Sequence, residues 1–170
     1  MKNVKKLALG AMLTAVAVAG SVLSFPVFGS RCSPVQHMVN ILCAVLLGPG
    51  YGLVAAFLAS LIRNLLGLGS LLAFPGSMFG ALLCGLVYKY GKNLWATCAG
   101  EVFGTAILGG LAAYPIAIAF MGKTAGDIAF YAYVIPFLVS TAGGAALSAV
   151  LILALSRTGI LAKVQAGLSR

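Results

Sequence analysis

Polar side chains that could bind a small molecule gather in one stretch of an otherwise apolar chain, Phe25–Asn40 (FPVFGSRCSPVQHMVN). His37 and Asn40 are three residues apart, so they would share one face of a helix that begins near Pro34. As neutral donors and acceptors they suit a heteroaromatic ligand that carries a hydroxyl group. Hydrogen bonding at the end of the helix is the alternative interpretation of this pair.

The same stretch contains the signals that start this helix. Pro26, Gly29 and Pro34 interrupt the apolar pattern, and Pro34 fits the first position of a helix. Ser33 would cap the helix, and Gln36 stands where a capping-box partner reaches back. We therefore expect Gln36 to be structural. A loop that leads into a helix N-terminus inside a membrane protein is a suitable place to bind a small polar molecule.

Two ionisable residues lie inside long apolar segments, Arg63 and Glu101. Ionisable groups at such positions are costly and are functional candidates by default. At ~1.5 Å per residue their depths differ by about 8 Å, which two long side chains can span. They form either a buried ion pair that fixes the helix packing or the floor of an outward-facing pocket.

Aromatic residues near the expected outer end could provide a stacking surface for a ring, although each alone is more often a core or interface residue. These residues are Phe25, Phe28, Phe74, Tyr114 and Tyr131.

Catalysis and cofactor binding find little support in the sequence. With only two acidic residues, an enzyme that needs paired carboxylates is excluded, and no catalytic triad, HExxH motif or acidic metal cluster occurs. Gly122-Lys123-Thr124 resembles the end of a phosphate-binding loop, but Ala117 replaces the required earlier glycine and no strand precedes it. The four cysteines are expected to be small buried residues, with no disulfide or metal site: Cys32, Cys43, Cys84 and Cys98.

Composition identifies the elements that must position these residues. The chain of 170 residues is 62% hydrophobic and only 8% charged, against about 25% charged in soluble domains. It is therefore expected to be an all-α integral membrane protein. Six spans of about 20 residues fit this length, so we predict a compact six-helix transmembrane bundle that forms a single domain over residues 1–170.

The predicted spans are roughly 7–24, 34–47, 51–66, 71–88, about 94–115 and 135–156. The second is only about 20 Å long, so the loop 25–33 must fill part of the membrane depth. The stretch 116–133 is expected to extend the fifth span and then to form a lid.

The net charge of +9 comes from residues that flank the predicted spans, which indicates membrane topology rather than nucleic-acid binding. With both termini in the cytoplasm, eight basic residues are cytoplasmic and three lie on the outer side. The loops at 25–40 and 115–133 then face outward and roof the pocket. The cytoplasmic group is Lys2, Lys5, Lys6, Lys89, Lys92, Arg157, Lys163 and Arg170, and the outer group is Arg31, Arg63 and Lys123.

A stripe of small residues marks the first span, where Ala11, Ala15 and Ala19 recur every four residues. Such a stripe lets another helix approach closely in lipid. That helix belongs either to this bundle or to a partner protein.

Several of these motifs together resemble the ThiW family, the predicted thiazole-precursor S component of energy-coupling factor (ECF) transporters. The similarity covers, in order, FPVFGSRCSPVQHMVN, Arg63–Gly67, LLAFPGSMFGALLCG at 71–85, Gly100-Glu101-Val102 and Ala113-Tyr114-Pro115.

The resemblance implies a substrate-binding subunit in a prokaryotic plasma membrane, with 5-(2-hydroxyethyl)-4-methylthiazole, a thiamine precursor, as its ligand. It also implies a transmembrane coupling protein and two cytoplasmic ATPases as partners, with the coupling protein docking on the alanine stripe. The expected ligand-binding residues are His37, Asn40, Arg63, Glu101, Tyr114, Phe28, Phe74 and Tyr131.

Three alternatives remain open at the level of sequence. The chain could be an S component for another vitamin precursor, which composition alone does not exclude. It could be a self-sufficient channel or facilitator, although no convincing inverted repeat relates its halves. A membrane enzyme would need catalytic groups that the sequence does not offer.

Overall fold

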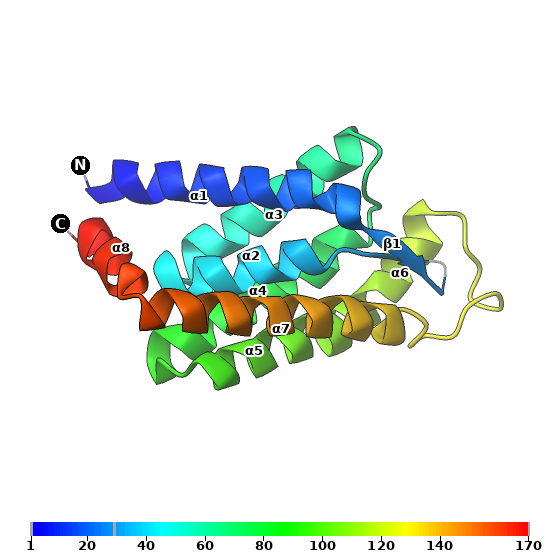
Figure 1. Cartoon of the computed structure of the whole chain (residues 1–170). Helices are drawn as coiled ribbons and strands as arrows, with labels where there is room; N and C mark the ends of the chain where they lie inside the picture. Colours follow the sequence, from blue (N-terminus) through cyan, green and yellow to red (C-terminus); the bar gives the residue numbers. More distant parts are fainter. Residues whose placement is uncertain (1, 29, 170) are drawn as a thin grey trace.

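The computed structural model describes residues 2–28 and 30–169, which form a helical bundle with one small β-hairpin (Figure 1). Two residues with sequence-based expectations lie outside the described residues. They are Gly29, expected to interrupt the apolar pattern, and Arg170, expected to be cytoplasmic. The elements in order are α1 Lys2–Gly20, η1 Ser21–Leu23, β1 Phe25–Val27, β2 Ser30–Cys32, α2 Pro34–Leu46, α3 Pro49–Leu65, α4 Ala73–Gly91, α5 Leu94–Val102, η2 Phe103–Gly109, α6 Gly110–Phe120, α7 Val134–Arg157 and α8 Ile160–Ser169.

The all-helical membrane class is confirmed. Three helical segments of the described chain are long and apolar enough to cross a membrane, namely Asn3–Leu23, Leu94–Phe120 and Val134–Arg157. The helices α2, α3 and α4 occupy the segments predicted as the second, third and fourth spans, with 13, 17 and 19 residues. The six-span count therefore stays a prediction.

The fifth predicted span is one continuous helical segment made of α5, η2 and α6. Its middle part, η2, is a π-helix, a widened turn that often occurs at functional sites. The segment continues through Pro115 to Phe120, in agreement with the expected extension of the fifth span into 116–133. In the turn that follows, the side chain of Asp127 accepts hydrogen bonds from the hydroxyl and the backbone N–H of Thr124. These bonds lower the pKa of Asp127.

The predicted loop 25–33 contains an antiparallel hairpin in which Phe25 pairs with Cys32 and Val27 with Ser30. Ser30 and Cys32 are buried while Arg31 is exposed, as expected for a strand with one face on the bundle. The hairpin connects α1 to α2 and lies at the end of the molecule away from the termini (Figure 1).

Helix α2 lies in the centre of the bundle and packs against α1, α3, α4 and α7. Glycines bring the surrounding backbones close together, which is the usual packing device in membranes. A Cβ atom at Gly104 would lie 2.7 Å from the backbone oxygen of Phe79, so η2 touches α4 directly. A Cβ atom at Gly144 would lie 2.6 Å from Cβ of His37, so α7 touches α2 at the predicted site.

Both chain ends lie at one end of the bundle, and the hairpin and the 121–133 segment lie at the other (Figure 1). Nζ of Lys5 donates to the backbone oxygen of Gly167 at 3.2 Å, which links α1 to α8. The turn between α4 and α5, with Lys89 and Lys92, is at the same end as the termini. This arrangement agrees with the predicted separation of the cytoplasmic loops from the pocket.

Candidate functional site

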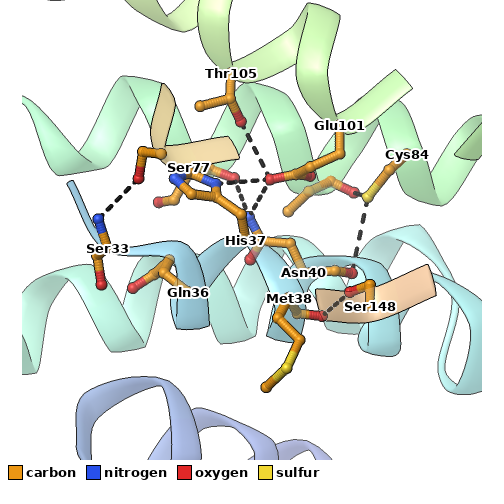
Figure 2. Close-up of polar contacts among 12 residues, drawn as sticks. Ser33, Gln36, His37, Met38, Asn40, Ser77, Cys84, Glu101, Thr105 and Ser148 are labelled. Atoms are coloured by element: carbon orange, nitrogen blue, oxygen red, sulfur yellow. Dashed lines mark hydrogen bonds and ion pairs between the residues drawn. The ribbon is translucent and has the colours of Figure 1, made fainter. Parts of the chain in front are cut away.

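The carboxylate of Glu101 is the centre of a buried polar cluster. Its Oε1 atom lies 2.9 Å from Nδ1 of His37, 3.0 Å from Nδ2 of Asn40 and 3.1 Å from Oγ1 of Thr105 (Figure 2). Glu101 has 0% exposed surface, and His37 and Asn40 are buried as well. An ionised carboxylate only accepts hydrogen bonds, so Nδ1 of His37 then carries the donated proton. The contact is an ion pair when the imidazole is protonated and a hydrogen bond otherwise.

Helical geometry explains how these side chains meet. The spacing of three residues places His37 and Asn40 on one face of α2, as predicted from the sequence. Thr105 is four residues after Glu101, so its hydroxyl reaches back along the helix to the carboxylate. Asn40 also donates to the backbone oxygen of Ser77 at 3.1 Å, which ties α2 to α4. Both amide hydrogens of Asn40 are thereby used.

Gly80 on α4 provides the space that the cluster occupies. A Cβ atom at this position would lie 2.7 Å from Oε1 of Glu101 and closer still to Oγ1 of Thr105. Any larger residue would therefore displace the carboxylate from its three donors.

Arg63 does not pair with Glu101, so the ion-pair hypothesis is wrong. NH1 of Arg63 donates to Oε1 of Gln36 at 2.8 Å. The expected capping box is wrong for the same reason, because the Gln36 side chain turns to Arg63 instead of to the helix end. Ser33 caps α2 without a side-chain hydrogen bond, and its backbone N–H donates to Oγ of Ser140 at 2.8 Å.

A polar cavity of about 30 Å³ lies beside this cluster. A water molecule needs roughly 10–15 Å³ by the same measure, so the cavity has room for about two. The hairpin, α2, α3, α4, η2 and α7 all contribute to its wall, at the end of the molecule away from the termini. The lining residues are Ser30, Arg31, Ser33, Gln36, His37, Arg63, Ser70, Leu72, Ala73, Gly76, Ser77, Thr105, Phe137 and Ser140.

Two of the eight residues expected to bind ligand, His37 and Arg63, line the cavity. Glu101 is bonded to the His37 ring, and Asn40 donates to the same carboxylate oxygen, so neither is part of the cavity wall. The four aromatic candidates are not part of the cavity wall. Phe74 packs against Phe57 with ring centroids 5.6 Å apart; Phe28 and Tyr131 are exposed, and Tyr114 is partly buried.

Sequence reasoning missed the aromatic residue that does line the cavity, Phe137 on α7. The structure shows that Gly76 leaves the space for its ring, because a Cβ atom there would lie 2.8 Å from Cε2 of Phe137. The serines of the wall were also missed. Ser77 and Ser140 are small polar residues inside apolar segments, a pattern that often marks interhelical contacts.

The stripe on α1 is exposed at Ala11, Ala15 and Ala19. Ala11 and Ala15 line an apolar groove of about 280 Å³ between α1 and α3. Gly10 and Tyr51 on α3 also line this groove. The stripe is thus exposed beside α3 and is available to another helix.

The comparisons with known proteins identify a family. A family model described as "Thiamine-precursor transporter protein (ThiW)" matches residues 7–158. No curated protein and no solved structure matches the chain.

Proposed function

Because the chain belongs to the ThiW family of thiamine-precursor transporters, we propose that it is the S component, the substrate-binding membrane subunit, of an ECF transporter. Family membership implies a membrane protein that transports a small molecule rather than an enzyme. The proposed substrate is 5-(2-hydroxyethyl)-4-methylthiazole. The observation that carries the proposal is the family match from residue 7 to residue 158, which spans every element from α1 to α7.

The cavity at the hairpin end is the proposed substrate site. His37 can contact a ligand in the cavity, while Glu101 bonds its ring and is itself held by Asn40. Phe137 and Leu72 provide an apolar wall for the thiazole ring, in place of the four aromatic residues expected from the sequence. Phe28, Phe74, Tyr114 and Tyr131 would reach the ligand only after a rearrangement of the outer segments.

The size of the ligand agrees with tight binding in an enclosed site. Hydroxyethylthiazole has about nine heavy atoms, and at up to ~1.5 kcal/mol per atom it could bind with nanomolar affinity. The cavity of about 30 Å³ must widen to admit it. The β-hairpin and the 121–133 segment, which lie over this end of the bundle, are the proposed lids.

Transport requires partners that the subunit does not contain. We propose a transmembrane coupling protein, docked on the alanine stripe of α1, and two cytoplasmic ATPases that supply the energy. In a prokaryotic plasma membrane the termini would lie in the cytoplasm and the cavity would open outward. The proposed architecture is one domain of six spans over residues 1–170.

Calorimetric titration of the purified subunit tests the substrate. We expect saturable binding of hydroxyethylthiazole and no binding of thiamine or of the pyrimidine precursor. His37→Ala should lower the affinity at least tenfold, because it removes a cavity residue without emptying the core. Tyr90→Ala, at the exposed cytoplasmic end of α4, is the control and should bind normally.

Binding of the pyrimidine or of thiamine alone would identify an S component for another precursor. A folded, monodisperse subunit that binds none of the three would overturn the substrate assignment. Flux of the thiazole into liposomes that contain this subunit alone would favour the channel alternative.

A further inference from the structure

Three residues that line the cavity each carry a buried hydrogen-bond donor without a partner. Ser33 Oγ, Gln36 Nε2 and Arg63 Nε have no hydrogen-bond partner among the described residues, and all three residues line the cavity. Their exposed fractions are 4%, 2% and 3%. The orientation of the Gln36 amide is determined by its neighbour: guanidinium NH1 can only donate, so Oε1 faces Arg63 and the NH₂ group is the free end. Buried donors that lack an acceptor are costly.

The positive charge of Arg63 has no ion-pair partner among the described residues. The chain has two acidic side chains, Glu101 and Asp127. Oε1 of Glu101 is bonded to His37, Asn40 and Thr105, and its Oε2 has no hydrogen-bond partner among the described residues and is not paired with Arg63; Asp127 is bonded to Thr124 on the exposed loop. The only protein acceptor recorded for Arg63 among the described residues is the neutral oxygen of Gln36. A buried guanidinium with a neutral partner is unfavourable unless an anion joins it.

A second cation and a hydroxyl strengthen the preference of the cavity for negative charge. Arg31 on the hairpin also lines the cavity, where its NH1 donates to the backbone oxygen of Gly67 at 3.2 Å. Ser140 Oγ accepts from Ser33 N–H, which leaves the hydroxyl proton of Ser140 free to donate. No carboxylate is among the lining residues. The space of about 30 Å³ accommodates two oxygen atoms.

We propose that this cavity binds an oxyanion, a carboxylate or phosphate, through Arg63 Nε, Gln36 Nε2 and Ser33 Oγ. The anion is either part of the thiazole ligand or an inorganic ion bound beside it. The thiazole part of this ligand rests on the proposed function. The anion site does not, because the unpartnered donors and the charge of Arg63 are present whatever the substrate is. The substrate class is then an anionic thiazole, or a neutral thiazole that binds together with an anion.

Titration of three thiazoles distinguishes these sources. The neutral ligand is hydroxyethylthiazole, and the anionic ones are its phosphate ester and 4-methylthiazole-5-acetate. We expect at least one anionic ligand to bind wild type at least tenfold more tightly than the neutral one, or the neutral one to gain at least tenfold affinity from inorganic phosphate. Arg63→Gln should abolish either effect, and Arg63→Lys should keep part of it. Arg157→Gln, an exposed arginine at the far end of α7, is the control and should keep it fully.

Equal or tighter binding of the neutral thiazole, with no effect of phosphate, would overturn the anion site while leaving the proposed substrate intact. The anion site would also be overturned if Arg63→Gln kept the tighter binding of the anionic thiazoles or the effect of phosphate. Should no thiazole bind at all, the proposed function fails, and the anion site is judged by thermal stability. Inorganic phosphate must then raise the melting temperature of wild type and of Arg157→Gln but not that of Arg63→Gln; equal shifts in all three would refute it.

Discussion

At the scale of single residues, the site depends on hydrogen-bond partners as much as on chemical groups. Glu101 is bonded to three donors from α2 and η2, and this holds His37 at the edge of the cavity. Arg63 takes a neutral partner instead, so the two ionisable groups of the membrane region have separate roles. Glu101 fixes the wall of the cavity through His37, and Arg63 leaves positive charge at the cavity.

Gly80→Ala tests whether the Glu101 cluster needs the space that this glycine leaves. The new methyl group would overlap Thr105 and the Glu101 carboxylate, so we expect a loss of about 1–3 kcal/mol of stability and weaker ligand binding. Melting temperature and calorimetric affinity measure the two effects. Gly91→Ala at the end of the same helix meets no atom within 4 Å and is the matched control. Equal melting of both variants and wild type would show that the space is not needed.

The sequence predicted where the polar residues of this region lie better than it predicted their partners. A spacing of three placed His37 and Asn40 together, and the cost of a charge in lipid identified Arg63 and Glu101. The pairing of Arg63 was wrong because the rise per residue gives the depth of a side chain but not its direction around the helix axis. Phe137 was missed for the same reason, since an aromatic residue in an apolar segment gives no sign of which face it occupies.

At the scale of elements, the close approach of helices is set by small residues. The η2 segment touches α4 at Gly104 and α7 touches α2 at Gly144, so the cavity is enclosed by backbones that could not approach if these positions carried side chains. The span boundaries were predicted to within a few residues because apolar runs and Gly-Pro turns mark them. The π-helix and the hairpin were not predicted, because they depend on packing rather than on local pattern.

The α1 stripe gives a prediction at this scale. Ala15→Trp fills the groove between α1 and α3, so we expect it to abolish uptake by the complete transporter while the isolated subunit still binds ligand. The measurements are uptake in cells and calorimetry on the purified subunit. Val16→Trp is the control, since Val16 is exposed on a different side of the same helix. Normal uptake with Ala15→Trp would refute the docking role.

At the scale of the whole molecule, the two ends are built from different segments. The termini and the α4–α5 turn share one end, and the hairpin, the cavity and the 121–133 segment share the other. The basic residues predicted to be cytoplasmic, such as Lys89, Lys92 and Arg157, lie at the first end. The distribution of charge along the sequence was sufficient to predict this polarity, although it says nothing about which helices are neighbours.

Thiol labelling of intact cells tests the orientation. Lys123→Cys lies on the exposed 121–133 segment and Arg157→Cys is exposed at the other end. A membrane-impermeant maleimide should modify the first and not the second, because only the hairpin end is expected to face outward. Background should be low, since the four native cysteines are buried. The reverse labelling pattern would place the cavity in the cytoplasm.

The small volume of the cavity has a kinetic consequence. A site with room for about two waters cannot admit a ligand of about nine heavy atoms, so binding requires a wider conformation that the unliganded protein adopts for some fraction of the time. Apparent affinity falls in proportion to that fraction, and a wider state present at about 1% would weaken it about a hundredfold. The observed association rate would then level off at high ligand concentration, where the widening of the cavity becomes rate-limiting.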